Sequence, residues 1–189
     1  LDEAYLDVTA NKCGNPSATL IAEEIRNRIF EELGLHASAG ISTNKFVAKI
    51  ASDINKPNGQ KTISEEEIPS FLENLAIEKF YGIGKVTRAK MYKLGIFTGS
   101  ELKEKSEAFL TEHFKKAGAY YYQLVRGIQV SEVKPDRIRK SIAAEHTFDQ
   151  NLTSEIYMLE KLEKISKSLE KRLLQSKVAG RTVTLKIKY

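Results

Sequence analysis

The sequence predicts a multi-domain α+β fold, with a partial α/β layer, an all-helical middle part that contains a helix-hairpin-helix, and a partial β-α-β unit. Strand and helix patterns alternate over residues 1–63, and short helices separated by glycine-containing turns fill residues 64–131. After a polar linker at residues 132–138, a long amphipathic helix lies between two segments of strand character, within residues 139–189. A chain of 189 residues is long enough for such parts to bury cores of their own.

The α/β layer is predicted from strand-forming composition, helical spacing of apolar residues and turn chemistry. Its expected elements are a strand at 1–10, a helix from Asn15-Pro16 to Gly34, a strand at 36–41, a helix from Ser42 to about Asn55, a turn at 56–59 and a strand at 60–63. Asn15 and Ser42 are expected to cap their helices, because a short polar side chain there can accept the first orphan N–H groups.

The helical part is expected to begin with a capping box formed by Ser64 and Glu67. In the last part, residues 153–176 place leucines and isoleucines on one stripe and predict a long helix. Strands are expected from Arg137 to Phe148 and from Arg181 to Tyr189, the second of which alternates apolar and polar residues.

Charge is unevenly distributed along the chain. The formal net charge is +5, and residues 137–189 hold 12 Lys and Arg against 6 Asp and Glu. A basic segment attached to near-neutral ones indicates either a polyanionic partner or a solvated lysine-rich surface. No apolar run approaches the roughly 18–20 residues of a membrane span. The single cysteine, Cys13, excludes an internal disulfide or a cysteine zinc cluster and fits a reducing cytoplasm.

Asp2 and Glu3 are the first candidates for chemistry. Adjacent carboxylates near a strand end can bind hard divalent cations such as Mg²⁺. Neighbouring residues of a regular strand point to opposite faces, so both reach one metal cluster only if the backbone turns there. Asp7 would share a face with Glu3. The competing interpretation is a solvated strand edge.

A row of lysines is predicted on the helix that ends before the Pro57-Asn58-Gly59 turn. Helical spacing places this polar row opposite the apolar face, and its members are Lys45, Lys49, Ser52 and Lys56. Lysine ammonium groups in such a row could hold a triphosphate as point charges. An ordinary amphipathic helix with a solvated face would give the same pattern.

Residues 80–96, FYGIGKVTRAKMYKLGI, have the pattern of a helix-hairpin-helix. Gly82 and Gly84 would let the backbone approach another molecule closely, and the start of the following helix would offer N–H groups to a phosphate. Lys85 and Arg88 lie beside this turn. Such a motif would bind duplex DNA without reading base edges, although a plain helix pair remains the alternative. Residues 114–126, with Gly118, could form a weaker second copy.

The basic last part contributes further candidates for DNA contact. Arg137, Arg139 and Ser141 would share one strand face, with Lys140 beside them. Thr184 and Lys186 would lie on the polar face of the last strand. A lysine-guarded sheet edge is the alternative.

Taken in order, the segments LDEAYLDVT, SATLIAEEIR, SAGISTNKFVAKIASDINKPNGQ, GIGKVTRAKMYKLGI and RIRKSI resemble the Y-family, or lesion-bypass, DNA polymerases, most of all their bacterial members. The resemblance implies a partial palm at residues 1–63, a thumb at 64–131 and a partial little finger at 139–189. It implies that Asp2 and Glu3 belong to the catalytic carboxylate cluster that binds two Mg²⁺ ions, and that Lys56 contacts the incoming nucleotide.

The resemblance also implies binding partners, and it implies that this chain is only part of a polymerase. Primer-template DNA and deoxynucleoside triphosphates would be the ligands, and a sliding clamp would bind a C-terminal peptide that this chain lacks. The first palm strand, the fingers and the end of the little finger have no counterpart here, so the chain by itself is expected to be a fragment without polymerase activity. Two other classes stay open from the residues, namely a non-catalytic helix-hairpin-helix DNA-binding module and a nuclease or other repair enzyme with such an accessory.

Overall fold

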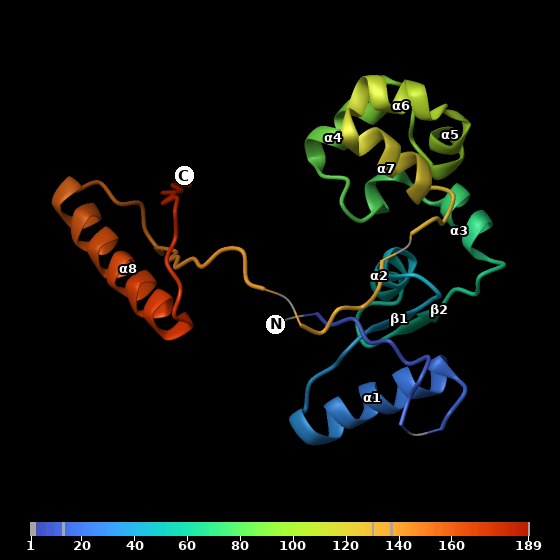
Figure 1. The fold of residues 1–189 in the computed structure, drawn as a ribbon, viewed down its shortest axis with the longest axis horizontal. Coiled ribbons are helices and arrows are strands. Elements are labelled where there is room, and N and C mark those ends of the chain that lie inside the picture. The colour runs from blue at the N-terminus through green and yellow to red at the C-terminus, as the bar shows by residue number, and fades with distance from the viewer. Residues whose placement is uncertain (1–2, 13, 130, 137, 189) are drawn as a thin grey trace. The chain divides into compact units, whose positions relative to one another are not determined.

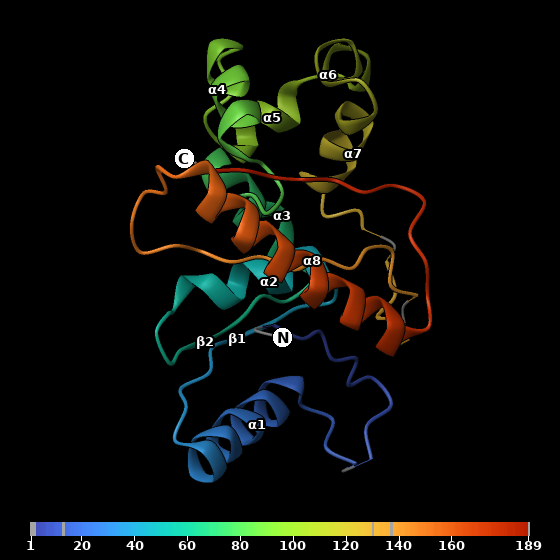
Figure 2. The ribbon, with the colours of Figure 1, turned by 90° about the vertical axis from the view of Figure 1, so that its left-hand side faces the viewer.

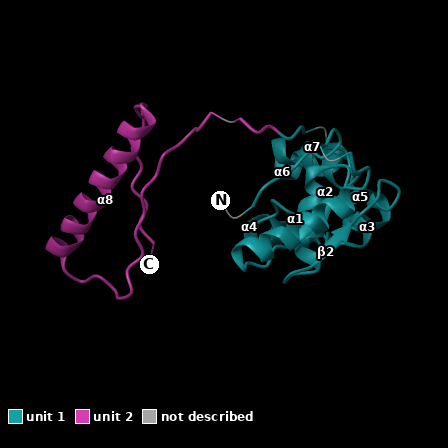
Figure 3. Cartoon of the chain, turned by 90° about the horizontal axis from the view of Figure 1, so that it is seen from below, with its two compact units in different colours: residues 1–133 teal, residues 134–189 magenta. Residues whose placement is uncertain are grey.

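The computed structural model describes residues 3–12, 14–129, 131–136 and 138–188. The chain divides into two compact units, residues 1–133 and residues 134–189 (Figure 3). The division falls inside the predicted linker at 132–138. The predicted palm and thumb lie together in the first unit.

The first unit begins with a small α/β layer. Strands β1 (Ala39–Ile41) and β2 (Gln60–Thr62) pair in parallel, with Ala39 opposite Gln60 and Ile41 opposite Thr62. Helices α1 (Ala18–Leu33) and α2 (Lys45–Ile54) lie on opposite sides of this ribbon (Figures 1 and 2). Gly40 permits the close approach of β1 to α2, since a Cβ atom there would lie 1.9 Å from the Ala48 carbonyl oxygen.

Both predicted N-caps of this layer were wrong by two residues. The Ser17 side chain caps α1 by accepting from the Leu20 N–H, while the Asn15 side chain accepts from the Ser17 N–H and forms the turn before it. Asn44, not Ser42, caps α2 by accepting from the Val47 N–H at 2.9 Å. The predicted end of α1 at Gly34 is confirmed, and this glycine has φ +66°.

The strand predicted at residues 1–10 was also wrong over the part that the structure describes. Residues 3–8 form neither helix nor strand, and residues 9–10 lie in a turn. A strand exists only through a hydrogen-bonded partner. In the described residues the sheet consists of β1 and β2 alone, so residues 3–8 have no ladder to join.

The middle part is helical, as predicted. Its elements are α3 (Ile68–Asn74), the 3₁₀ turn η1 (Ile77–Lys79), α4 (Lys85–Lys93), α5 (Gly99–Glu104), α6 (Glu107–Phe114) and α7 (Lys116–Leu124). The capping box predicted for Ser64 and Glu67 forms only in half, since the Glu67 carboxylate accepts from the Ser64 backbone N–H. The complete box is that of Thr98 and Glu101 at the start of α5.

A single hydrophobic core joins the α/β layer to the helical part. Buried residues of α2 pack with buried residues of α3 to α7, and the rings of Phe46 and Phe80 lie 5.8 Å apart between centroids. Burying one such side chain contributes roughly 1.5–3 kcal/mol. The shared core therefore fixes α2 against the segment that enters the glycine hairpin.

The second unit contains the long helix α8 (Glu155–Ser176), close to the predicted 153–176, with Ser154 as its N-cap. The two flanking strands that were predicted do not form in residues 138–148 and 182–188. Two short strands around one helix make a poor sheet, because each would leave an unpaired edge. The Arg172 guanidinium of α8 donates to the Ala143 carbonyl oxygen at 2.5 Å and holds the preceding segment to the helix. None of the helices in the described residues combines the length and the apolar composition that a membrane span requires.

Candidate functional site

A chain of ion pairs connects the N-terminal segment to the end of α2. The Glu3 carboxylate Oε1 lies 2.8 Å from the Lys49 Nζ, and Lys49 Nζ lies 3.0 Å from the Asp53 Oδ2. The other oxygen of Asp53 lies 2.6 Å from the Lys56 Nζ. Glu3 and Lys56, predicted from distant positions to serve one reaction, are thus joined through two intervening side chains. Asp2 lies outside the described residues, so its place beside Glu3 stays a prediction.

The charges in this ion-pair chain support one another. Burial alone would lower the pKa of Lys49, but hydrogen bonds and proximity to Glu3 and Asp53 outweigh it and raise that pKa. For Asp53, burial acts to raise the pKa, and the hydrogen bonds from Lys56 and Lys49 prevail and lower it. Both shifts favour the charged forms of Lys49 and Asp53 near neutral pH.

The turn that carries Lys56 is held by an arginine that the sequence analysis missed. The Arg26 side chain of α1 donates to the Asn58 carbonyl oxygen at 2.7 Å and to the Ala37 carbonyl oxygen at 2.9 Å. It also donates to the Asn58 side-chain oxygen at 2.9 Å. Its place three residues before Ile29 of the apolar stripe was the available sign that Arg26 faces the layer rather than solvent.

The predicted lysine row divides into two parts. Lys49 and Lys56 share Asp53, whereas the Lys45 Nζ donates to the Glu132 carbonyl oxygen at 2.7 Å. The Ser52 hydroxyl donates back to the Lys49 carbonyl oxygen within α2. Lys45 therefore serves the junction after α7, and Lys49 and Lys56 are the members of the row that face the candidate site.

Asp7 does not join Glu3, as it would on a regular strand. Its Oδ1 accepts from the Thr9 backbone N–H at 3.0 Å, a bond that lowers the pKa of Asp7. The described residues contain no group of three or more His, Cys, Asp or Glu side chains able to hold a metal ion. The carboxylate chemistry of Glu3 suits a divalent cation, but one described carboxylate does not complete a two-metal site.

The glycine hairpin has the backbone that a close approach requires. Gly82 has φ +91°, which an L side chain rarely adopts, and a Cβ on Gly82 or Gly84 would meet no atom within 4 Å. Ile83 between them is buried and anchors the turn to the core. Gly84 is the N-cap of α4, whose first N–H groups have no partner within the helix and face an open surface. The first half of the predicted helix pair is only the 3₁₀ turn η1.

The basic residues of the hairpin differ in how they are held. Lys85 is exposed, whereas Arg88 pairs with Glu78 of η1 at 3.3 Å. Gly118, proposed for a second copy of the motif, lies instead in a helix contact, since a Cβ there would lie 2.1 Å from the Leu110 carbonyl oxygen. The described geometry gives one hairpin.

In the second unit, the predicted DNA contacts do not share a strand face, because the strands are absent from its described residues. These side chains are all exposed, and they are Arg139, Lys140, Ser141, Thr184 and Lys186. Arg137 lies outside the described residues. Their exposure leaves these side chains accessible to a ligand.

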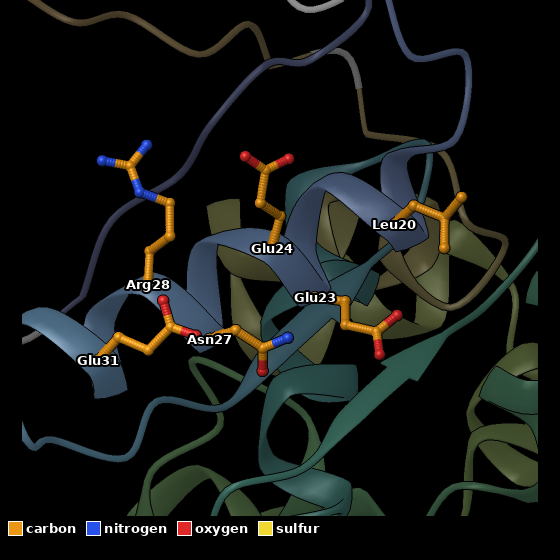
Figure 4. Close-up of a pocket in the computed structure, with 6 residues that line it drawn as sticks. All are labelled: Leu20, Glu23, Glu24, Asn27, Arg28 and Glu31. Atoms are coloured by element: carbon orange, nitrogen blue, oxygen red, sulfur yellow. The ribbon is translucent and has the colours of Figure 1, made fainter.

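One surface hollow lies away from these candidate residues. It has a volume of about 400 Å³ and lies along one side of α1, lined by Leu20, Glu23, Glu24, Asn27, Arg28 and Glu31 (Figure 4). It shares no residue with the ion-pair chain. Its three glutamates disfavour an anionic ligand such as a triphosphate.

Family models match three parts of the chain. Residues 1–53 match the impB/mucB/samB family, residues 65–96 match the IMS family HHH motif, and residues 139–189 match the impB/mucB/samB family C-terminal domain. The matches follow one another in the order of the three predicted parts.

Curated relatives cover the whole chain. It is 51% identical to DNA polymerase IV 2 of Agrobacterium fabrum and 48% identical to DNA polymerase IV of Listeria monocytogenes, in each case over all 189 residues and 53% of the relative. The chain spans about half the length of these curated relatives.

Solved structures agree with the relatives. The match to DinB from Sulfolobus solfataricus covers 68% of this chain and 38% of the DinB chain, with 31% identity and a TM-score of 0.62. The match to a Y-family DNA polymerase chimera covers 88% of this chain and 48% of the chimera, with 29% identity and a TM-score of 0.75. These sequence and fold likenesses, with three family matches in the same order, make the chain a homologue of the Y-family DNA polymerase IV proteins.

Proposed function

We propose that this chain is part of a template-directed DNA polymerase that acts in translesion synthesis. The observation that carries the proposal is the ion-pair chain from Glu3 through Lys49 and Asp53 to Lys56. It connects a carboxylate suited to cations with a lysine suited to a triphosphate, in a homologue of DNA polymerase IV.

The reaction would be nucleotidyl transfer. The primer 3′-oxygen forms a bond to the α-phosphorus of the incoming nucleotide, the bond from that phosphorus to the bridging oxygen breaks, and pyrophosphate leaves. Asp2 and Glu3 would hold the cations, and two Mg²⁺ ions, when bound, would neutralise charge on the attacking and leaving oxygens. Lys56 would hold the triphosphate, on a turn that Arg26 fixes.

The primer-template DNA would be held without regard to its sequence. The exposed start of α4 after Gly84 would take a backbone phosphate, with Lys85 beside it. The exposed basic residues of the second unit would add contacts to DNA phosphates. Deoxynucleoside triphosphates as substrates, Mg²⁺ as cofactor and a sliding clamp as partner are parts of the proposal that rest on homology.

Primer extension by a full-length polymerase that carries this segment tests the proposal. A chimera in which this chain replaces the matching half of the Listeria monocytogenes DNA polymerase IV is expected to extend a primer with Mg²⁺ and all four nucleotides. Glu3→Ala should abolish extension, and Glu24→Ala on the exposed side of α1 is the matched control. Wild-type activity in the Glu3→Ala chimera would contradict the proposal. The 189-residue chain alone is expected to give no extension above background.

A non-catalytic DNA-binding module is the second candidate, favoured by the preformed hairpin and the exposed Lys85. Charge reversal at Lys85 should weaken DNA binding under both proposals. Loss of synthesis with retained DNA binding in the Glu3→Ala chimera distinguishes the polymerase from the module.

A further inference from the structure

Lys49 occupies the centre of the ion-pair chain. Its ammonium lies between two carboxylates, at 2.8 Å from Glu3 and 3.0 Å from Asp53. Its side chain is only 12% exposed, whereas that of Lys56 is 52% exposed. Two lysines of one helix row therefore have different surroundings, one enclosed by protein groups and the other open to a ligand.

Two tyrosines also lie near the Lys49 ammonium group. The Tyr81 ring at the glycine hairpin lies 5.8 Å from the Lys49 Nζ, measured to its centroid. Tyr5, two residues after Glu3, interacts electrostatically with both Lys49 and Tyr81. Lys49 thus lies where the N-terminal segment, α2 and the hairpin of the first unit meet.

We propose that Lys49 is a positioning residue for DNA synthesis, which holds the Glu3 carboxylate toward α2 and, through Asp53, couples it to Lys56. The proposal rests on the proposed function. Residues 3–8 have no strand ladder in the described structure, so the ion pair to Lys49 is a tertiary contact that fixes the Glu3 side chain. A carboxylate can accept at both oxygens, so pairing through Oε1 does not exhaust its capacity to bind other groups.

The arrangement separates positioning from direct nucleotide binding. An ammonium that already contacts two carboxylates has little net attraction for a phosphate, because their two negative charges outweigh its one positive charge. Lys56 is the more open lysine of the pair that Asp53 bridges. Loss of Lys49 should therefore impair the chemical step, whereas loss of Lys56 should impair nucleotide binding.

Carbodiimide coupling of the 189-residue chain tests the contact without any catalytic readout. This reagent joins a carboxylate to a touching amine, and mass spectrometry should find a Lys49–Glu3 cross-link that Glu3→Gln removes. The Lys103–Glu73 ion pair of the helical part supplies an internal positive control. Absence of the Lys49–Glu3 cross-link, when the Lys103–Glu73 one forms, would overturn the proposal.

Steady-state kinetics of the full-length chimera tests the consequence. Lys49→Met should lower kcat about 10–100-fold, with a much smaller change in the nucleotide KM, as for the loss of an outer-shell partner. Lys49→Arg should restore most of the rate, because it keeps the charge. Lys103→Met, which also removes an ion-paired lysine, should leave both constants unchanged. A loss confined to the nucleotide KM, or an unchanged kcat, would overturn the positioning role.

The two proposals fail in different ways. If Glu3→Ala abolishes synthesis while Lys49→Met does not change kcat, the polymerase assignment holds and the role of Lys49 is wrong. If Glu3→Ala retains synthesis, the proposed function itself is wrong. Far-UV circular dichroism and thermal unfolding of each variant exclude loss of the fold as the cause.

Discussion

The two units of this chain show how differently one sequence can support its secondary structure. In the first unit, α2 and the six elements from α3 to α7 contribute to one core in which Leu72 and Ile77 are fully buried. In the second, the described residues contain no buried hydrophobic side chain, and Ile138 and Val183 are 93% and 89% exposed. The difference lies in the partners that each apolar stripe finds. Helices can cover one another over short connections, whereas alternating segments form a sheet only when several pair.

The largest expected difference between the two units is in their rates of amide hydrogen exchange. Amides of α2 and of α3 to α7 should exchange through cooperative opening, and those of residues 138–148 and 182–188 should exchange almost as in an unfolded chain. The difference in protection is expected to reach at least about 10³-fold. Mass-spectrometric exchange of the 189-residue chain checks it. Protection of residues 182–188 equal to that of α3 would break the comparison.

Two leucine-to-alanine substitutions, one in each unit, test the difference in burial between the units. Leu72→Ala should cost about 2–5 kcal/mol of unfolding free energy, because the side chain is fully buried and leaves a cavity. Leu159→Ala on α8, where the leucine is 59% exposed, should change it by less than about 0.5 kcal/mol. Urea unfolding followed by circular dichroism measures both. Equal losses would show that the stripe of α8 is covered.

A glycine pair tests the close packing of the first unit. Gly40→Ala should cost about 1–3 kcal/mol, because the new Cβ meets the backbone of α2 at Ala48 and Ser52. Gly84→Ala is the control, since its Cβ would meet open space and its φ of −75° suits alanine. A thermal-unfolding series compares the two. An unchanged midpoint for Gly40→Ala would show that α2 and β1 separate at little cost.

DNA binding distinguishes a preformed site from an extended segment. Lys85→Gln should lower the salt dependence of duplex binding by about one counterion, since Lys85 lies beside a formed helix start. Lys186→Gln should have a weaker effect, because Lys186 lies in no helix or strand that would hold its side chain in place. Fluorescence anisotropy at several salt concentrations measures each slope. A larger effect for Lys186→Gln would reverse the assignment of the main contact.

The smallest effect concerns pH. The Thr98 hydroxyl and the Phe97 and Thr98 backbone N–H groups lower the pKa of Glu101 below its ordinary 4.5. A carboxylate with a lowered folded pKa stabilises the fold above its unfolded pKa, and the contribution disappears as pH falls through the folded value. Glu101→Gln should therefore destabilise the first unit at pH 7, and this loss of stability should shrink as pH falls below 4.5 and through the folded pKa. Glu163→Gln on α8, which removes the pair with Lys167, should not change unfolding of the first unit at either pH. If Glu101→Gln lowered the free energy of unfolding as much at pH 3 as at pH 7, the stabilising role of the capping box would be contradicted.

Local chemistry was predictable where it depends on neighbouring residues. The glycine end of α1, the long helix α8 and the hairpin glycines Gly82 and Gly84 follow from turn and helix patterns, and the structure has them. The caps at Ser17 and Asn44 were missed because several polar residues compete before each helix. The ion pair of Lys49 with Glu3 was not predicted, since Glu3 is 46 positions away and only the packing of the first unit brings the two together.

The sequence by itself determined the order of the parts, the helices of the middle region and the candidate residues for binding cations and phosphate, because composition and spacing act over a few residues. Only the tertiary structure decided which of them meet. Glu3 contacts Lys49, Arg26 holds the turn of Lys56, and the alternating segments of the second unit stay unpaired. Pairing of strands and of distant charges depends on what the rest of the fold brings alongside, and no local pattern specifies that.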